Sequence, residues 1–225
     1  MSRTRTAARS RAAARSRTAA LLAVPLVAGG LLGAAAVPAG AHPRPAAAAP
    51  LTCQGRGVDP AAAVRHRTET VIDAPLNTVW KLQTDVARWP SWQPPVASAE
   101  RLDHGPLRAG SAFRWTIPVP PTPSTPALDL DITSTVRQLE RGSCIRWTGP
   151  AVDEAHGVRI DGVHVWRFSP TRGGGVRVST EETHTGPVVD GDVPTATRVL
   201  REGLEAWLRD LKTAAEAAEA GGCRP

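Results

Sequence analysis

The chain has 225 residues, which is enough for one domain of ordinary size with appendages. Its formal net charge is +6, but residues 1–41 hold six arginines and no acidic residue. Removing these six from the 27 Lys and Arg leaves 21, which equals the 21 Asp and Glu. A body that is neutral by count lacks the clustered basic residues of a DNA or RNA surface, so we expect no nucleic-acid partner.

Residues 1–41 have the order of an export signal: arginines, then an apolar stretch from Ala19 to Val37, then Ala39-Gly40-Ala41. The last three residues give the small-x-small pattern that signal peptidase cleaves. We therefore expect a signal peptide and a secreted or cell-envelope protein. The alternative is an uncleaved anchor, because the apolar stretch approaches the length of a membrane span. No second apolar span follows, so we expect no stable span after cleavage.

The cysteines are Cys53, Cys144 and Cys223. Export would place them in an oxidising compartment, where disulfides persist. We expect a Cys53–Cys223 bridge that ties the two tails together, and a lone Cys144 inside a strand, although three cysteines allow three single bridges or none. Their spacing does not resemble a zinc site, and we expect no bound metal.

Residues 42–63 are rich in Pro and Ala and lack apolar periodicity, which predicts a flexible tail. A strand is expected at 64–72, and Ala74-Pro75 then leads into two short helices that end near Trp92. Extended segments follow at 97–102, 111–119, 128–136, 144–149, 162–169 and 175–186. Repeated prolines at 118–126 predict a stiff, exposed loop.

The C-terminal part is helical. Apolar residues recur at three and four residues from Val199 to Leu211, in a helix that Pro194 begins and Gly221-Gly222 ends. One amphipathic helix packed on a twisted antiparallel sheet is an α+β fold. We expect the domain to span 64–220, with a short tail at 221–225.

Several short motifs occur in an order that is typical of one protein superfamily. They are Ala74-Pro75 with Val79-Trp80, Trp89-Pro90-Ser91-Trp92, Gly110–Trp115, Ile145–Gly149, His164–Phe168, Glu182–Gly186 and Leu204–Leu208. Together they resemble the START-like, Bet v 1-like superfamily, also called SRPBCC or polyketide cyclase/dehydrase-like, over about residues 64–218. The resemblance implies a helix-grip fold, in which the sheet wraps around a long C-terminal helix. It also implies a cavity between them for a sterol, lipid, polyketide, hormone or other apolar molecule.

The aromatic residues are the candidate lining of that cavity. The inward strand positions and the helix stripe hold Phe113, Trp115, Trp147, Trp166, Phe168 and Trp207. Trp89 and Trp92 are expected near its mouth. A tryptophan offers a large apolar area and one N–H donor, which suits a flat ligand with a polar edge. The alternative is that tryptophans at alternating positions simply form the core.

His164, Glu182 and His184 fall on the same strand faces as the aromatic residues, on neighbouring strands. A carboxylate beside imidazoles in an apolar cavity forms a candidate acid–base group, such as a polyketide cyclase or dehydratase needs to enolise a ketone and lose water. The alternatives are a hydrogen-bonded polar group without catalysis, or a shift of one residue that turns Glu181 inward instead.

We therefore expect a secreted protein that binds a small hydrophobic molecule without turnover. The first alternative is a cyclase/dehydratase-type enzyme that uses the His164, Glu182 and His184 group. The second is a cell-envelope interaction module whose loop at 118–126 docks a protein. The chain has no Gly-rich phosphate loop and no Gly-x-Ser-x-Gly motif, and we expect no cofactor.

Overall fold

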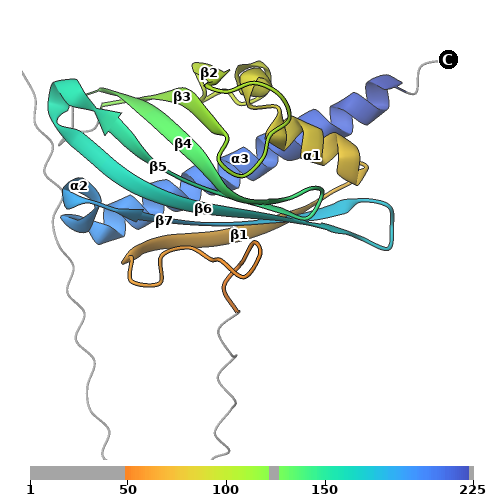
Figure 1. The fold of residues 1–225 in the computed structure, drawn as a ribbon, viewed down its shortest axis with the longest axis horizontal. Helices are drawn as coiled ribbons and strands as arrows, with labels where there is room; N and C mark the ends of the chain where they lie inside the picture. The colour runs from red at the N-terminus through yellow and green to blue at the C-terminus, as the bar shows by residue number, and fades with distance from the viewer. Residues whose placement is uncertain (1–48, 122–126, 223–225) are drawn as a thin grey trace, which may run out of the picture. The chain divides into compact units, whose positions relative to one another are not determined.

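A computed structural model of the chain describes residues 49–121 and 127–222 (Figure 1). The predicted signal peptide, Cys223 and the centre of the proline-rich loop lie outside these residues. In the described part, none of the helices is both long enough and apolar enough to cross a membrane.

Antiparallel strands form one seven-stranded sheet in the order β1-β7-β6-β5-β4-β3-β2. Its strands are β1 (Val64–Ile72), β2 (Ser98–Arg101), β3 (Ala112–Val119), β4 (Leu128–Glu140), β5 (Cys144–Asp153), β6 (Val158–Pro170) and β7 (Val176–Thr185). The predicted first strand and the six that follow it are confirmed.

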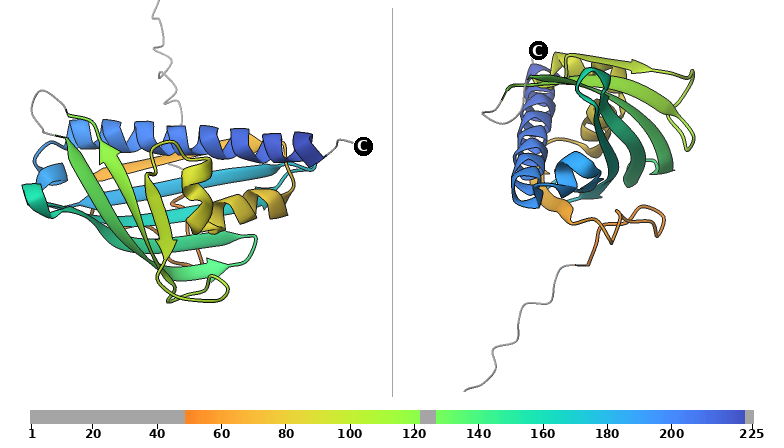
Figure 2. Two further views of the ribbon diagram at one scale, coloured as in Figure 1. Left: turned by 90° about the horizontal axis from the view of Figure 1, so that it is seen from above. Right: turned by 90° about the vertical axis from the view of Figure 1, so that its left-hand side faces the viewer.

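The predicted helices stand at the predicted places, and two further short helices were not predicted. The helix α1 (Leu76–Thr84) and the 3-10 helix η1 (Val86–Ser91) follow β1, and α3 (Val193–Gly222) ends the described chain. Of the two that were not predicted, η2 (Glu154–His156) joins β5 to β6, and α2 (Pro187–Asp190) precedes α3. Figure 2 shows α3 running along β1 on the inner side of the curved sheet. The predicted α+β helix-grip fold is confirmed.

The inner face of the sheet is apolar because side chains alternate along each strand. In β3, Phe113 and Trp115 are buried, while Arg114 between them is exposed. The helix α3 adds a buried stripe at three- and four-residue spacing, formed by Leu200, Leu204, Leu208 and Leu211. Burying a leucine stabilises the fold by about 1.5–3 kcal/mol, so this stripe fixes α3 against the sheet.

The strands β5 and β6 extend further than the sequence predicted. They were expected to end at Gly149 and to begin at Gly162, but these two glycines pair and the strands continue to the η2 turn. A glycine inside a strand suggests a break, yet here Gly149 has a packing reason. A Cβ atom at Gly149 would lie 2.0 Å from the backbone oxygen of Thr133 on β4, so only glycine fits.

The segment before β1 packs on the outer face of the sheet, so the prediction of a flexible tail at 42–63 is wrong for the described residues 49–63. Leu51, Cys53 and Val58 are buried there against Cys144 and Val165. The strands β5 and β6 present an apolar patch on this face, and the segment covers it. We call residues 51–58 the strap.

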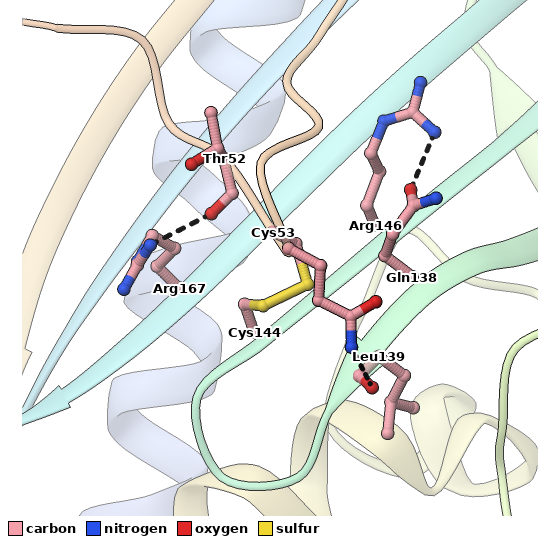
Figure 3. The surroundings of a disulfide bond; sticks show 8 residues. Thr52, Cys53, Gln138, Leu139, Cys144, Arg146 and Arg167 are labelled. Carbon is pink, nitrogen blue, oxygen red and sulfur yellow. Dashed lines mark hydrogen bonds between the residues drawn. A yellow bond between two sulfur atoms is a disulfide. The ribbon is translucent and has the colours of Figure 1, made fainter.

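A disulfide joins Cys53 to Cys144 (Figure 3), with the two Cα atoms 5.4 Å apart. The predicted Cys53–Cys223 bridge and the lone Cys144 are therefore wrong. Cys144 points outward from β5, beneath the strap, rather than into the main core. Arg167 Nη1 donates a hydrogen bond of 3.0 Å to the Thr52 carbonyl and so helps hold the strap.

The outer and inner faces of β7 each carry a buried or half-buried glutamate. Glu181 faces outward, where it accepts a 2.7 Å hydrogen bond from the Leu51 backbone N–H and forms an ion pair with Arg65. Glu182 faces inward, opposite His164 on β6. The predicted orientation of β7 is therefore correct, and the alternative with Glu181 inward is wrong.

Candidate functional site

Trp89 lies at the centre of the aromatic core. Its side chain is fully buried and meets other rings edge to face, with centroid separations of 5.4 Å to Phe113, 5.4 Å to Trp115 and 5.0 Å to Trp207. The Trp89 Nε1–H donates a 3.2 Å hydrogen bond to the Gln83 carbonyl. The prediction that Trp89 lies at a cavity mouth is therefore wrong, because η1 folds this ring into the interior.

Trp207 connects α3 to the sheet. Its ring lies 5.5 Å from that of Trp115 and 6.2 Å from that of Trp166, and its Nε1–H donates a 3.1 Å hydrogen bond to Gln83 Oε1. Trp92 is half-buried at the edge of this cluster, 6.1 Å from Trp207. These rings fill the interior near η1, where the resemblance had implied open space.

The remaining predicted aromatics divide into two groups. Phe168 packs edge to face against Trp80 of α1 at 5.2 Å, so it belongs to the core beneath α1. Trp147 and Trp166 flank His164, with ring centroids 5.1 Å and 4.9 Å from the imidazole. The predicted polar group thus lies directly beside the tryptophan core.

The three predicted polar residues come together on the inner face of β6 and β7. His164 Nδ1 lies 3.3 Å from Glu182 Oε2, and His184 Nε2 lies 3.3 Å from Glu182 Oε1. Exposure rises along the group, from 6% for the His164 side chain to 18% for Glu182 and 25% for His184. A molecule on the inner face would therefore meet His184 and Glu182 before His164.

Thr180 holds the inner end of this group. Its hydroxyl lies 2.6 Å from His164 Nε2 and is buried. A neutral imidazole has one donor and one acceptor nitrogen. The Thr180 hydroxyl donates a 3.3 Å hydrogen bond to the Val165 carbonyl, so its oxygen is left to accept the Nε2–H of His164. Thr180, His164, Glu182 and His184 thus lie in one row of contacts, in which Thr180 orients the His164 ring.

Burial and charge separate the protonation states of the group. Burial lowers the pKa of His164 to about 4. The Glu182 carboxylate acts in the opposite direction and raises this pKa, but its effect is smaller. Burial raises the pKa of Glu182, but the imidazoles of His164 and His184 outweigh it and leave that pKa below its ordinary value. At neutral pH the group therefore consists of a charged carboxylate and a neutral His164.

His66 is a neighbour that the sequence reasoning missed. It lies on β1 opposite Glu182, with Nε2 3.7 Å from Glu205 Oε1 of α3. Burial lowers its pKa, Glu205 raises it, and Arg201 lowers it. The sequence did indicate this position, because His66 lies at every second residue with Val64 and Thr68, and these three side chains share the inner face of the strand.

A row of half-buried apolar side chains crosses the inner face on β4, β5 and β6, next to the strand that carries Glu182 and His184. Ile132 of β4 lies opposite Ala151 of β5, which in turn lies opposite Ile160 of β6, all on the inner face. Beside them, Gly162 carries no side chain over Glu182: a Cβ there would lie 3.5 Å from Glu182 Oε1. At this end Ile160 also packs against the buried Val64, Val189 and Leu200, yet all three apolar side chains of the row keep part of their surface exposed.

Two surface hollows lie elsewhere, next to α1. One, of about 520 Å³, is lined by Trp92, Leu82 and Lys81, among others, and the second, of about 490 Å³, by Trp80 and Leu107, among others. Neither is lined by Glu182 or the two histidines. Among the described residues, no group of three or more His, Cys, Asp or Glu side chains is arranged to hold a metal ion.

Comparison with protein families gives a match over most of the domain. Residues 63–216 match the family described as "Polyketide cyclase / dehydrase and lipid transport". No curated protein matches the chain.

Solved structures share the fold. A START superfamily protein from Mycobacterium smegmatis is 14% identical with a TM-score of 0.54, covering 68% of this chain and 98% of its own. A protein from Thermus thermophilus is 21% identical with a TM-score of 0.53, over 68% and 98%. The di-domain ARO/CYC StfQ from the steffimycin biosynthetic pathway is 18% identical with a TM-score of 0.50, over 69% of this chain and 46% of its own.

Proposed function

Because the chain belongs to the polyketide cyclase/dehydrase and lipid transport family, we propose that it binds a small apolar molecule on the inner face of its sheet. The occupied region is the end near Ile132 and Ile160, with the polar edge of the molecule at Glu182 and His184. The observation that carries this proposal is a partly exposed carboxylate and imidazole that stand between a tryptophan core and half-buried isoleucines.

The chemistry of this region suits such a ligand. Apolar surface is worth about 25 cal/mol per Å² when it leaves water, and Ile132, Ile160 and Trp207 all keep part of their surface uncovered. A few polar groups then fix the orientation of the ligand. Because the rings around Trp89 fill the interior near η1, a compact molecule fits this proposal better than a long-chain lipid.

The binding test is native mass spectrometry of the protein purified from its own host, followed by identification of any released compound. In the Ile132→Phe variant, a larger ring on the inner face should displace the compound. The matched control is Arg114→Phe, which places the same ring on the exposed outer face of β3. Equal loading of both variants would contradict binding at the inner face.

A second candidate function is acid–base catalysis of the cyclase or dehydratase type. The observation in its favour is the ordered group from Thr180 to His184, in which a charged Glu182 stands next to the more exposed imidazole. Such a pair can remove a proton from the carbon beside a ketone. Glu182→Gln would abolish turnover of an enolisable aromatic ketone while retaining its binding. A turnover rate equal to wild type would contradict this role.

Export of the protein is part of the proposal. The buried Cys53–Cys144 disulfide supports it, because such bonds persist in oxidising compartments, and the signal-like leader supports it independently. The test is the intact mass of the protein from the culture fluid and from the cell envelope. A mass matching residues 42–225 would support cleavage, and a full-length protein held in the cytosol would contradict export.

A further inference from the structure

The carboxylate of Glu182 has no arginine or lysine partner among the described residues. The charged groups that act on it are the imidazoles of His164 and His184. Imidazoles are ordinarily neutral at about pH 8, and burial keeps His164 neutral well below that pH. On the facing α3, Arg201 and Glu205 act on His66 with opposite signs. Among the described residues, the negative charge of Glu182 is therefore offset by imidazoles and by no arginine or lysine.

The neighbouring Glu181 shows how the same fold compensates a buried carboxylate. On the outer face, Glu181 pairs with Arg65 and accepts the backbone N–H of Leu51 beneath the strap. Glu182 has no such partner among the described residues, although its side chain is also largely buried, with 18% exposed. Burying a charge without a permanently charged partner is costly, so a complementary cation would stabilise this site.

Glu182 also has hydrogen-bonding capacity left over. An ionised carboxylate offers about four acceptor positions. Its contacts to His164 and His184 are both 3.3 Å, long for charge-assisted hydrogen bonds. A donor with a positive charge would therefore find free lone pairs at a partly exposed carboxylate.

The apolar surroundings of the group favour the same sign of charge. Trp147 and Trp166 flank His164 at 5.1 Å and 4.9 Å, beside that imidazole's contact with Glu182. A medium of low dielectric strengthens both the attraction of the Glu182 carboxylate for a cation and its repulsion of a second anion.

We propose that this site selects a compact apolar molecule that carries a protonated amine, with the ammonium group donating to the Glu182 carboxylate. The inference rests on the proposed binding function and names its substrate class. A ligand that carries a carboxylate, such as a free fatty acid, should bind this site more weakly than the amine. The apolar body of the amine lies against Ile132 and Ile160.

The test uses three probes with one ring system: 2-naphthylmethylamine, 2-naphthylmethanol and 2-naphthoate. Their affinities for the full-length protein are measured by calorimetry at about pH 8, where imidazole is neutral and the amine is protonated. Hydrogen bonds to charged groups are worth about 1.5–3 kcal/mol, so the amine should bind at least about tenfold more tightly than the alcohol. Naphthoate should bind most weakly.

The matched variants are Glu182→Gln and Glu100→Gln, which remove one negative charge from the site and from the exposed β2 strand respectively. Glu182→Gln should make the amine and the alcohol equal, while still binding the alcohol, which also shows that it is folded. Glu100→Gln should leave the preference unchanged. Naphthoate binding as tightly as the amine would overturn this inference alone, whereas no binding by any probe would overturn the proposed function as well.

Discussion

The Cys53–Cys144 disulfide should account for a large share of the stability of the domain. The two cysteines are 91 residues apart, and a bridge that closes a loop of this size is worth about 4–5 kcal/mol in the loop-entropy model. We therefore expect the double variant Cys53→Ala/Cys144→Ala to lose about 4–5 kcal/mol in the free energy of unfolding. Loss of strap packing, which buries Leu51 and Val58, would add to this value.

Guanidinium denaturation followed by tryptophan fluorescence measures this loss, because the tryptophans lie in the main core. The control is Cys223→Ala, which should leave the midpoint unchanged. A loss below about 1 kcal/mol in the double variant would refute the reasoning, since that is the range of an ordinary substitution. An equal loss in Cys223→Ala would show that the bridge joins a different pair.

Three further predictions concern the core and the site. Trp89→Ala should destabilise the domain by about 3–5 kcal/mol, as measured by denaturation, because it empties the centre of the aromatic cluster. Gly149→Ala should lower the melting temperature strongly because its Cβ meets the backbone of β4, while Gly173→Ala, with open space around it, should not. His164 has its pKa lowered from 6.5 to about 4, so the unfolded chain binds its proton first, and stability should fall as pH drops through this window. The loss is on the order of 3 kcal/mol; His164→Gln should flatten the profile, and an unchanged slope would contradict the assignment.

The sequence predicted the fold well because the fold depends on short-range patterns. Alternation in β3 and the leucine stripe of α3 each identify one face without any knowledge of the partner element. The same alternation placed His164 and Glu182 on one face of neighbouring strands. These face assignments in the strands are confirmed because strand pairing preserves the period of two.

Apart from the oversight of His66, the errors depend on contacts between distant segments. Nothing in the composition of residues 42–63 shows that the outer face of β5 offers Cys144 and Val165 to the strap. The burial of Trp89 depends on how η1 turns over the sheet, which spacing does not determine. In the sequence, Gly149 indicates the end of a strand. Its actual role depends on the backbone of Thr133, which lies too close for a side chain. His66 was overlooked although its own alternation indicated the inner face.

The most direct test of the central claim is a titration of ¹⁵N-labelled protein with 2-naphthylmethanol, followed through the indole N–H signals of the tryptophans. Binding on the inner face should shift the signals of Trp207 and Trp166, together with the backbone amides of Ile132, Gly162 and His184. The signals of Trp80 and Trp92, which line the surface hollows next to α1, should move little. Shifts confined to Trp92 and Lys81, or no shifts at all, would contradict binding between α3 and the inner face of the sheet.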